Sequence, residues 1–143
     1  MLARAKQRLS VAGRGTVVEF RAGELDALPI ATGEVDGLVC GMVLHHLATF
    51  EKPLHEMHRA LKPGGAAVVL ELAPHREAWL HESLGHRHLG LNPTDVVAAF
   101  LRAGFASAEI EPVDDRYLPH HGTSADSPPQ LSLYLVRARK ARA

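Results

Sequence analysis

The chain has 143 residues, and its 16 Lys and Arg residues balance 16 Asp and Glu residues, so its formal net charge is zero. This length allows one domain with a self-supporting core, and the balanced charge argues against a nucleic-acid partner. The single cysteine excludes an internal disulfide and favours a reducing compartment. No apolar run approaches the roughly 20 residues that span a bilayer. We therefore expect a cytoplasmic protein with no membrane partner.

Hydrophobic patterning predicts helices and strands that alternate along the chain. The expected elements are a short helix within residues 1–14, strands at 16–20 and 35–41, a helix at 49–61, a strand at 66–72, helices at 76–89 and 96–103, and strands at 108–113 and 131–136. The strands at 35–41 and 66–72 are almost continuously apolar, which is typical of parallel strands with helices on both faces. The pattern favours a single α/β domain with a mainly parallel sheet.

Three acidic residues are candidates for a binding role. Glu24 and Asp26 follow the first predicted strand at its carboxyl end, where ligands collect in open sheets, although a solvated turn explains them equally well. Glu71 falls inside an apolar strand. An unpaired carboxylate there would have a raised pKa and cost several kcal/mol, so Glu71 should be paired or face a cleft. A structural role for Glu71 is slightly favoured.

Ten histidines raise the question of a metal site. His55 and His58 are three residues apart on a predicted helix, among charged residues where solvated histidines need no ligand role. The other pairs that are close in sequence are His86 with His88 and His120 with His121. We expect no metal site from these spacings.

His45 and His46 differ from the other histidines because they directly follow the buried strand at 35–41. They stand at its carboxyl end, where ligands collect. A helix-capping role or a hydrogen-bonded core position is an equally good interpretation. Cys40, inside the same strand, is expected to be inert packing.

Three sequence blocks, taken in order and spacing, resemble the class I S-adenosylmethionine-dependent methyltransferases. They are residues 19–29 (EFRAGELDALP), residues 35–40 with 42–47 (VDGLVC and MVLHHL), and residues 59–65 (RALKPGG). The resemblance is greatest to the methyltransferase type 11 branch, which includes menaquinone and ubiquinone C-methyltransferases. It runs from residue 1 to about 113 and, more weakly, to 136.

The resemblance implies S-adenosylmethionine as the cofactor and a small molecule as the methyl acceptor. In the family, the loop that corresponds to Glu24 and Leu25 meets the adenine of the cofactor. The backbone around Cys40, Gly41 and Met42 corresponds to the part that lies beside the methionine end. These five residues are the expected cofactor-binding residues.

By the same resemblance, His45 and His46 lie on the side where acceptor and methyl group meet. They are candidates for positioning the substrate or removing its proton. Methyl transfer is a displacement at a sulfonium carbon, so alignment of the nucleophile and exclusion of water can supply much of the rate without a dedicated acid or base.

The sequence departs from the family pattern in its first part. Family members begin with a strand and a Gly-rich turn that receives the methionine end, followed by a second strand whose terminal acid holds the ribose, and this sequence has neither. We therefore expect residues 1–143 to form a single partial methyltransferase domain, a Rossmann-like sheet without strands 1 and 2. The family strand order is 3-2-1-4-5-7-6, so the missing strands would separate the segment at 16–20 from the strand at 35–41.

Two functions remain open on these grounds. One is methyl transfer that is impaired in the isolated chain, with weak or absent binding of S-adenosylmethionine. The other is a non-catalytic remnant that acts as a binding or interaction module. The gap in the sheet would be closed by direct pairing of the strands at 16–20 and 35–41, by self-association through the open edge, or not at all, and self-association is favoured.

Overall fold

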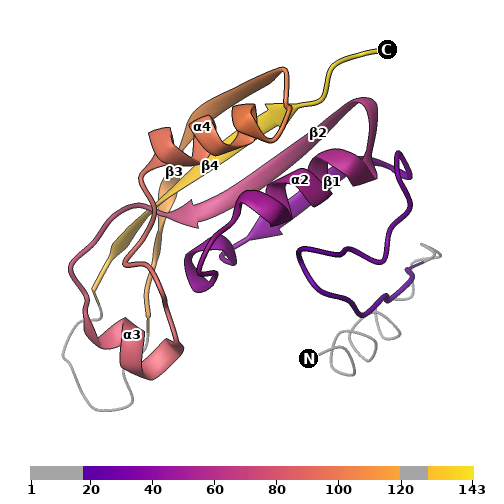
Figure 1. The fold of residues 1–143 in the computed structure, drawn as a ribbon. Helices are drawn as coiled ribbons and strands as arrows, with labels where there is room; N and C mark the ends of the chain where they lie inside the picture. The colour runs from indigo at the N-terminus through magenta and orange to yellow at the C-terminus, as the bar shows by residue number, and fades with distance from the viewer. Residues whose placement is uncertain (1–17, 120–128) are drawn as a thin grey trace.

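The computed structural model describes residues 18–119 and 129–143, which form a four-stranded sheet with helices packed against it (Figure 1). The elements in chain order are β1 (Val35–Gly41), the short 3₁₀ turn η1 (Leu44–His46), α2 (Glu51–Ala60), β2 (Leu61–Leu72), α3 (Trp79–Leu84), α4 (Pro93–Arg102), β3 (Ser107–Tyr117) and β4 (Leu131–Arg139). The helix expected within residues 1–14, and the pair His120 and His121, lie outside the described residues.

The strand order in the sheet is β1-β2-β4-β3. It reproduces the 4-5-7-6 part of the order that the family resemblance implied. β1 and β2 are parallel, whereas β4 is antiparallel to both β2 and β3. β1, β2 and β3 therefore run in the same direction, and β4 is the one reversed strand among those described. β4 is reversed because β3 and β4 are consecutive in the chain and pair directly with each other, as antiparallel neighbours do.

Strand β1 has the predicted bounds, whereas β2 begins at Leu61 instead of residue 66. The predicted turn at 62–65 is an irregularity within the strand. Val35 pairs with Leu61 but Gly37 pairs with Ala66, so residues 62–65 shift the register. Gly64 has a φ of 78°, a backbone conformation that glycine adopts without strain. The Lys-Pro-Gly-Gly sequence thus interrupts the ladder without ending it.

The strand expected at 16–20 is not present in its described part, since residues 18–20 have no regular structure. The chain continues as a loop, in which Glu24 and Ala27 form an isolated bridge. Arg21 contacts the carboxylates of Glu19 and Glu34 at 2.8 and 2.6 Å, which holds the loop in place. Direct pairing of this segment with β1, one of the three alternatives, is not seen, and β2 is the only strand beside β1 within the described ranges.

Helices α2 and α4 cover one face of the sheet (Figure 1). Apolar side chains recur at helical spacing in both helices, which places a stripe of each against the strands. The core there includes Leu54 and Met57 of α2, Val96 and Phe100 of α4, and Cys40, Val69 and Val136 of the sheet. Side chains alternate along a strand, so Val39 lies on the opposite face, where it is 83% exposed. Helices thus cover one face of β1, not both as expected, within the part of the chain that the structure describes.

The remaining elements differ from prediction mainly at their ends. Helix α3 has six residues and stops at Gly85, which has a φ of 68°, whereas a helix over 76–89 was expected. Helix α4 starts at Pro93, three residues early, because Asn92 caps it by accepting a hydrogen bond from the backbone N–H of Thr94. No helix in the described ranges is long and apolar enough to cross a bilayer.

Candidate functional site

The segment that follows β1 is held by a carboxylate from β2. The backbone N–H groups of Val43 and Leu44 donate to Oε1 of Glu71 at 3.0 and 2.6 Å. Met42, just before them, has a φ of 58°, which is uncommon for a residue other than glycine. This bend turns the chain out of the strand and into η1.

Glu71 also binds the first histidine of the pair. Nδ1 of His45 donates to Oε2 of Glu71 at 2.7 Å, and the backbone N–H of Leu72 donates to the same oxygen at 3.2 Å. The Glu71 side chain is fully buried and contacts these groups, which confirms the expectation that it is paired. Because Nδ1 of His45 faces the carboxylate, Nε2 is the ring nitrogen that remains for a second partner.

A third histidine, His86, completes a cluster that sequence reasoning missed. Its ring centroid lies 4.3 Å from that of His45 and 4.8 Å from that of His46, and the rings of His45 and His46 are 4.2 Å apart. Burial, reinforced by the nearby His45, lowers the pKa of His86 to about 4, so its ring is neutral at pH 7. The cluster joins two loops that are 40 residues apart in sequence, so no spacing rule could reveal it.

The loop that carries His86 is anchored to η1 by its backbone. The N–H groups of Arg87 and His88 both donate to the carbonyl of His45 at 3.0 Å. Nδ1 of His46 lies 3.3 Å from the carbonyl of Gly85, and Nε2 of His88 lies 3.0 Å from the carbonyl of Leu47. These contacts hold the loop after α3 over the histidine pair.

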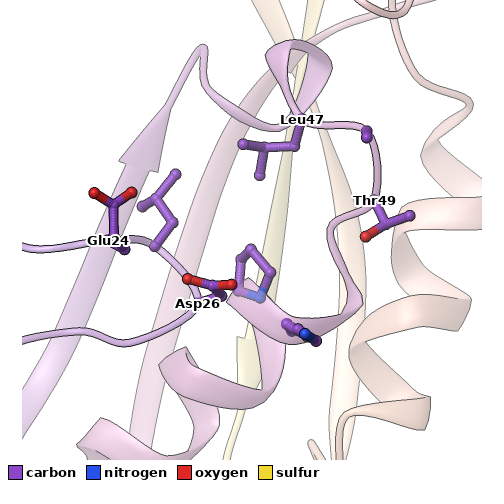
Figure 2. Close-up of a pocket in the computed structure, with 8 residues that line it drawn as sticks. Glu24, Asp26, Leu47 and Thr49 are labelled. Atoms are coloured by element: carbon purple, nitrogen blue, oxygen red, sulfur yellow. The ribbon is translucent and has the colours of Figure 1, made fainter.

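A pocket of about 280 Å³ lies beside this segment (Figure 2). Its lining residues are Glu24, Leu25, Asp26, Leu47, Ala48, Thr49, Lys52 and Pro53. Figure 2 shows Glu24 and Asp26 on one side and Leu47 and Thr49 on the other. The acidic turn therefore faces the residues that directly follow η1.

The predicted cofactor residues divide between this pocket and the strand. Glu24 and Leu25 line the pocket, whereas Cys40, Gly41 and Met42 are not among its lining residues. The Cys40 side chain belongs to the core, and burial raises the pKa of its thiol to about 11, with a smaller contribution from the charge of Glu71. Cys40 is thus protonated at neutral pH, as expected for inert packing.

The pocket fits one end of S-adenosylmethionine in its chemistry and size. Two carboxylates, of Glu24 and Asp26, can accept hydrogen bonds from the amine or hydroxyl groups of a nucleoside. Leu25, Leu47 and Pro53 offer apolar contacts to a base. The volume of about 280 Å³ lies just below the roughly 300–1,000 Å³ of complete ligand sites. The described residues therefore offer room for part of the cofactor.

A second hollow, of about 410 Å³, lies along the loop that precedes β1. It is lined in part by Glu19, Arg21 and Glu34, whose charges already pair with one another. None of its lining residues comes from the segment after β1. This hollow is larger than the pocket beside Glu24, but the segment that carries His45 and His46 does not line it.

The histidines of α2 do not join the cluster. His55 is exposed, but the ring of His58 lies 5.1 Å from that of Phe105, and burial lowers the pKa of His58. The expectation that His58 is solvated is therefore wrong, because the loop after α4 packs over it.

Comparison with known proteins supports one family over much of the chain. Residues 1–69 match the family model described as a methyltransferase domain. Over 73 residues the chain is 37% identical to a demethylmenaquinone methyltransferase of Desulfitobacterium hafniense (strain Y51), a stretch that is 51% of this chain and 29% of the relative. Over 127 residues it is 28% identical to an arsenite methyltransferase of Halobacterium salinarum, covering 85% of this chain and 32% of the relative. The chain thus spans about a third of the length of these relatives.

The fold is also similar to that of solved proteins. A structure from Bacillus halodurans C-125, described as a methyltransferase, has a TM-score of 0.73 and covers 98% of this chain and 78% of its own at 15% identity. At this identity the likeness shows the fold alone. Together with the strand order of the sheet, the sequence match over residues 1–69 and this fold support the resemblance to the class I S-adenosylmethionine-dependent methyltransferases.

Proposed function

We propose that the chain takes part in methyl transfer from S-adenosylmethionine to a small-molecule acceptor. The observation that supports this is one short segment, residues 42–49, which links the two ends of the site. Its first half forms η1 with His45 and His46, and its second half lines the pocket opposite Glu24 and Leu25. A cofactor in that pocket would have its reactive end directed along this segment toward the histidines.

When bound, S-adenosylmethionine supplies a methyl group on a sulfonium sulfur. In our proposal Glu24 accepts hydrogen bonds from the nucleoside and Leu25 contacts its base. The backbone of Cys40, Gly41 and Met42 then lies beside the methionine part. The bend at Met42 supports this, because it turns the backbone away from the strand at that point.

His45 and His46 are proposed to act on the acceptor side. Nε2 of His45 can accept a hydrogen bond or a proton from the nucleophile, because its Nδ1 is already bonded to Glu71. The carboxylate of Glu71 would stabilise the positive charge that a protonated His45 carries. His46 is exposed and so is accessible to an acceptor that arrives from solvent.

The size of the pocket supports weak cofactor binding by this chain. The pocket is smaller than a complete ligand site, so most of the surface of a cofactor placed there would stay in contact with water. We therefore propose that the affinity is weaker than micromolar, which corresponds to about −8 kcal/mol. Calorimetric titration tests this, and sub-micromolar binding would contradict it.

The same titration tests the placement of the cofactor. Glu24→Ala should weaken the binding of S-adenosylmethionine, since Glu24 lines the pocket. Glu82→Ala is the matched control, because Glu82 is exposed on α3 and does not line the pocket. Equal affinities in both variants and the unaltered chain would count against the proposed site.

A second candidate function is an interaction module that self-associates through β1. Within the described ranges, β1 pairs with β2 on one side only, so its other edge offers unpaired backbone groups. The 83% exposure of Val39 on that strand supports this candidate, because a second copy would cover it. For either function the single cysteine supports a reducing compartment, and we propose the cytoplasm as its location.

A further inference from the structure

We propose that His45, His46 and His86 form a binding site for a divalent transition-metal ion such as Zn²⁺. One ring nitrogen from each of the three histidines lies within 4.8 Å of those of the other two. His45 and His86 are only 1% and 4% exposed, whereas His46 is open to solvent. The cluster is thus a partly enclosed set of three imidazoles with one accessible side.

The hydrogen bonds of His45 and His46 orient their rings as metal ligands are oriented. Nδ1 of His45 donates to the carboxylate of Glu71, and Nδ1 of His46 faces the carbonyl of Gly85. A histidine that binds a metal through one nitrogen usually donates the other N–H to a carboxylate or a backbone carbonyl. Both partners therefore leave the Nε2 lone pairs of His45 and His46 free for an ion.

His86 supplies an independent observation. Its Nδ1 atom is buried and has no hydrogen-bond partner in the described part of the chain. A buried polar atom without a partner costs about 1–3 kcal/mol, so such atoms call for an explanation. An ion bound between His86 and the two neighbouring rings would give this buried nitrogen a partner.

The geometry needs only a small adjustment. Zinc binds imidazole nitrogen at about 2.0–2.1 Å, so two ligand nitrogens at a tetrahedral centre are about 3.4 Å apart. Closing the widest separation, 4.8 Å, requires ring movements of about 1 Å. His46 has room for this because it is exposed, and His86 follows Gly85, where the chain leaves α3.

The ligand set selects the class of ion. Three imidazole nitrogens suit zinc, nickel, copper or cobalt, whereas magnesium and calcium prefer oxygen ligands. Three protein ligands leave the fourth position of a tetrahedral ion open to water or another ligand. The exposed side at His46 is where that position would lie. The expectation of no metal site rested on histidines that are close in sequence, and this cluster forms between two segments that are 40 residues apart.

Titration of the full chain with Zn²⁺ by calorimetry, and with Co²⁺ by visible absorption, tests the proposal after treatment with a chelator. We expect one ion per chain, with affinity reduced about tenfold or more in His46→Ala and in His86→Ala. His55→Ala should bind like the unaltered chain, because His55 is exposed on α2 outside the cluster.

Two outcomes would overturn the metal site. One is the absence of Zn²⁺ binding at about 100 μM, and the other is equal affinity in His46→Ala, His86→Ala and the unaltered chain. His46 is exposed, so its variant should fold even if removal of His86 disturbs the loop. The readout is metal binding alone, so failure here would leave the proposed methyl transfer untouched. While an ion is bound, Nε2 of His45 is occupied and cannot accept a proton, so added Zn²⁺ should lower any turnover that depends on His45.

Discussion

Nδ1 of His45 donates a hydrogen bond to Oε2 of Glu71 across 2.7 Å, and both side chains are almost completely buried. Glu71 belongs to β2, whereas His45 belongs to the turn that follows β1. The same carboxylate receives the backbone N–H groups of Val43 and Leu44. One buried side chain therefore fixes the segment that carries the histidines and, farther along, lines the pocket.

Replacing Glu71 with Gln should lower the free energy of unfolding by about 3 kcal/mol or more. A glutamine has one acceptor oxygen and an NH₂ group, so some of the buried donors around position 71 would lose their partner. Urea unfolding at pH 7 measures the loss. Glu82→Gln on α3 is the control and should change the stability by no more than about 0.5 kcal/mol. A Glu71→Gln chain as stable as this control would contradict the assigned role.

Replacing His45 or His46 with Ala should lower turnover more than cofactor affinity. Both side chains are proposed to act on the acceptor side, away from the pocket lined by Glu24. Formation of S-adenosylhomocysteine across a panel of small-molecule acceptors measures turnover, and calorimetry measures the affinity for S-adenosylmethionine. Unchanged turnover in both variants would leave the histidines as structural residues. A loss of cofactor affinity without a loss of turnover would also contradict the proposed role of the two histidines.

Stability should fall as pH rises from about 9 to 11 through the thiol of Cys40. Burial raises the pKa of Cys40 from its ordinary value of 9.0 to about 11, so the unfolded chain loses this proton first. The stabilising effect is complete below pH 9, and two pKa units correspond to about 2–3 kcal/mol.

Urea unfolding of the chain and of Cys40→Ala at pH 8 and pH 11 isolates the contribution of this thiol, because other groups titrate equally in both proteins. The unaltered chain should lose more stability than the variant between these pH values. Parallel losses in the two proteins would show that the thiol is not protected as the structure implies.

Self-association should depend on Val39. The unpaired edge of β1 in the described ranges, together with the exposed valine, favours pairing with a second copy. Sedimentation across a concentration series should show a dimer or larger species, and Val39→Lys should shift it toward monomer. Leu101→Lys, at a similarly apolar position that is 48% exposed on α4, should not. A monomer at every concentration would remove the interaction-module candidate.

The strand order and most elements could be predicted from the sequence. Apolar periodicity indicates each helix or strand over a short stretch, and the family resemblance implied the strand order. β1 was predicted with its bounds, since a nearly continuous apolar run ends where the chain bends at Met42. The loop at residues 18–20 was not predicted. The ion pairs of Arg21 with Glu19 and Glu34 favour a loop there over a strand that has no neighbour.

Tertiary contacts explain what the sequence could not predict in the site. His86 reaches the histidine pair only because the backbone of residues 87 and 88 binds the carbonyl of His45. His58 is covered only because Phe105 returns to α2 after α4. Neither contact leaves a periodic or spacing signal. Glu71 could be predicted to be paired, since burial of a carboxylate demands it, but its partner could not be named.

Mapping of amide chemical shifts during titration with S-adenosylmethionine shows whether the cofactor binds in the pocket beside Glu24. We predict that millimolar cofactor shifts the amides of Glu24, Leu25 and residues 47–49, which line the pocket of about 280 Å³. The same shifts should be weaker with Glu24→Ala. The larger hollow around Glu19, Arg21 and Glu34 serves as the internal comparison. Shifts centred on that hollow, or no shifts at millimolar cofactor, would show that the pocket beside Glu24 is not the cofactor site.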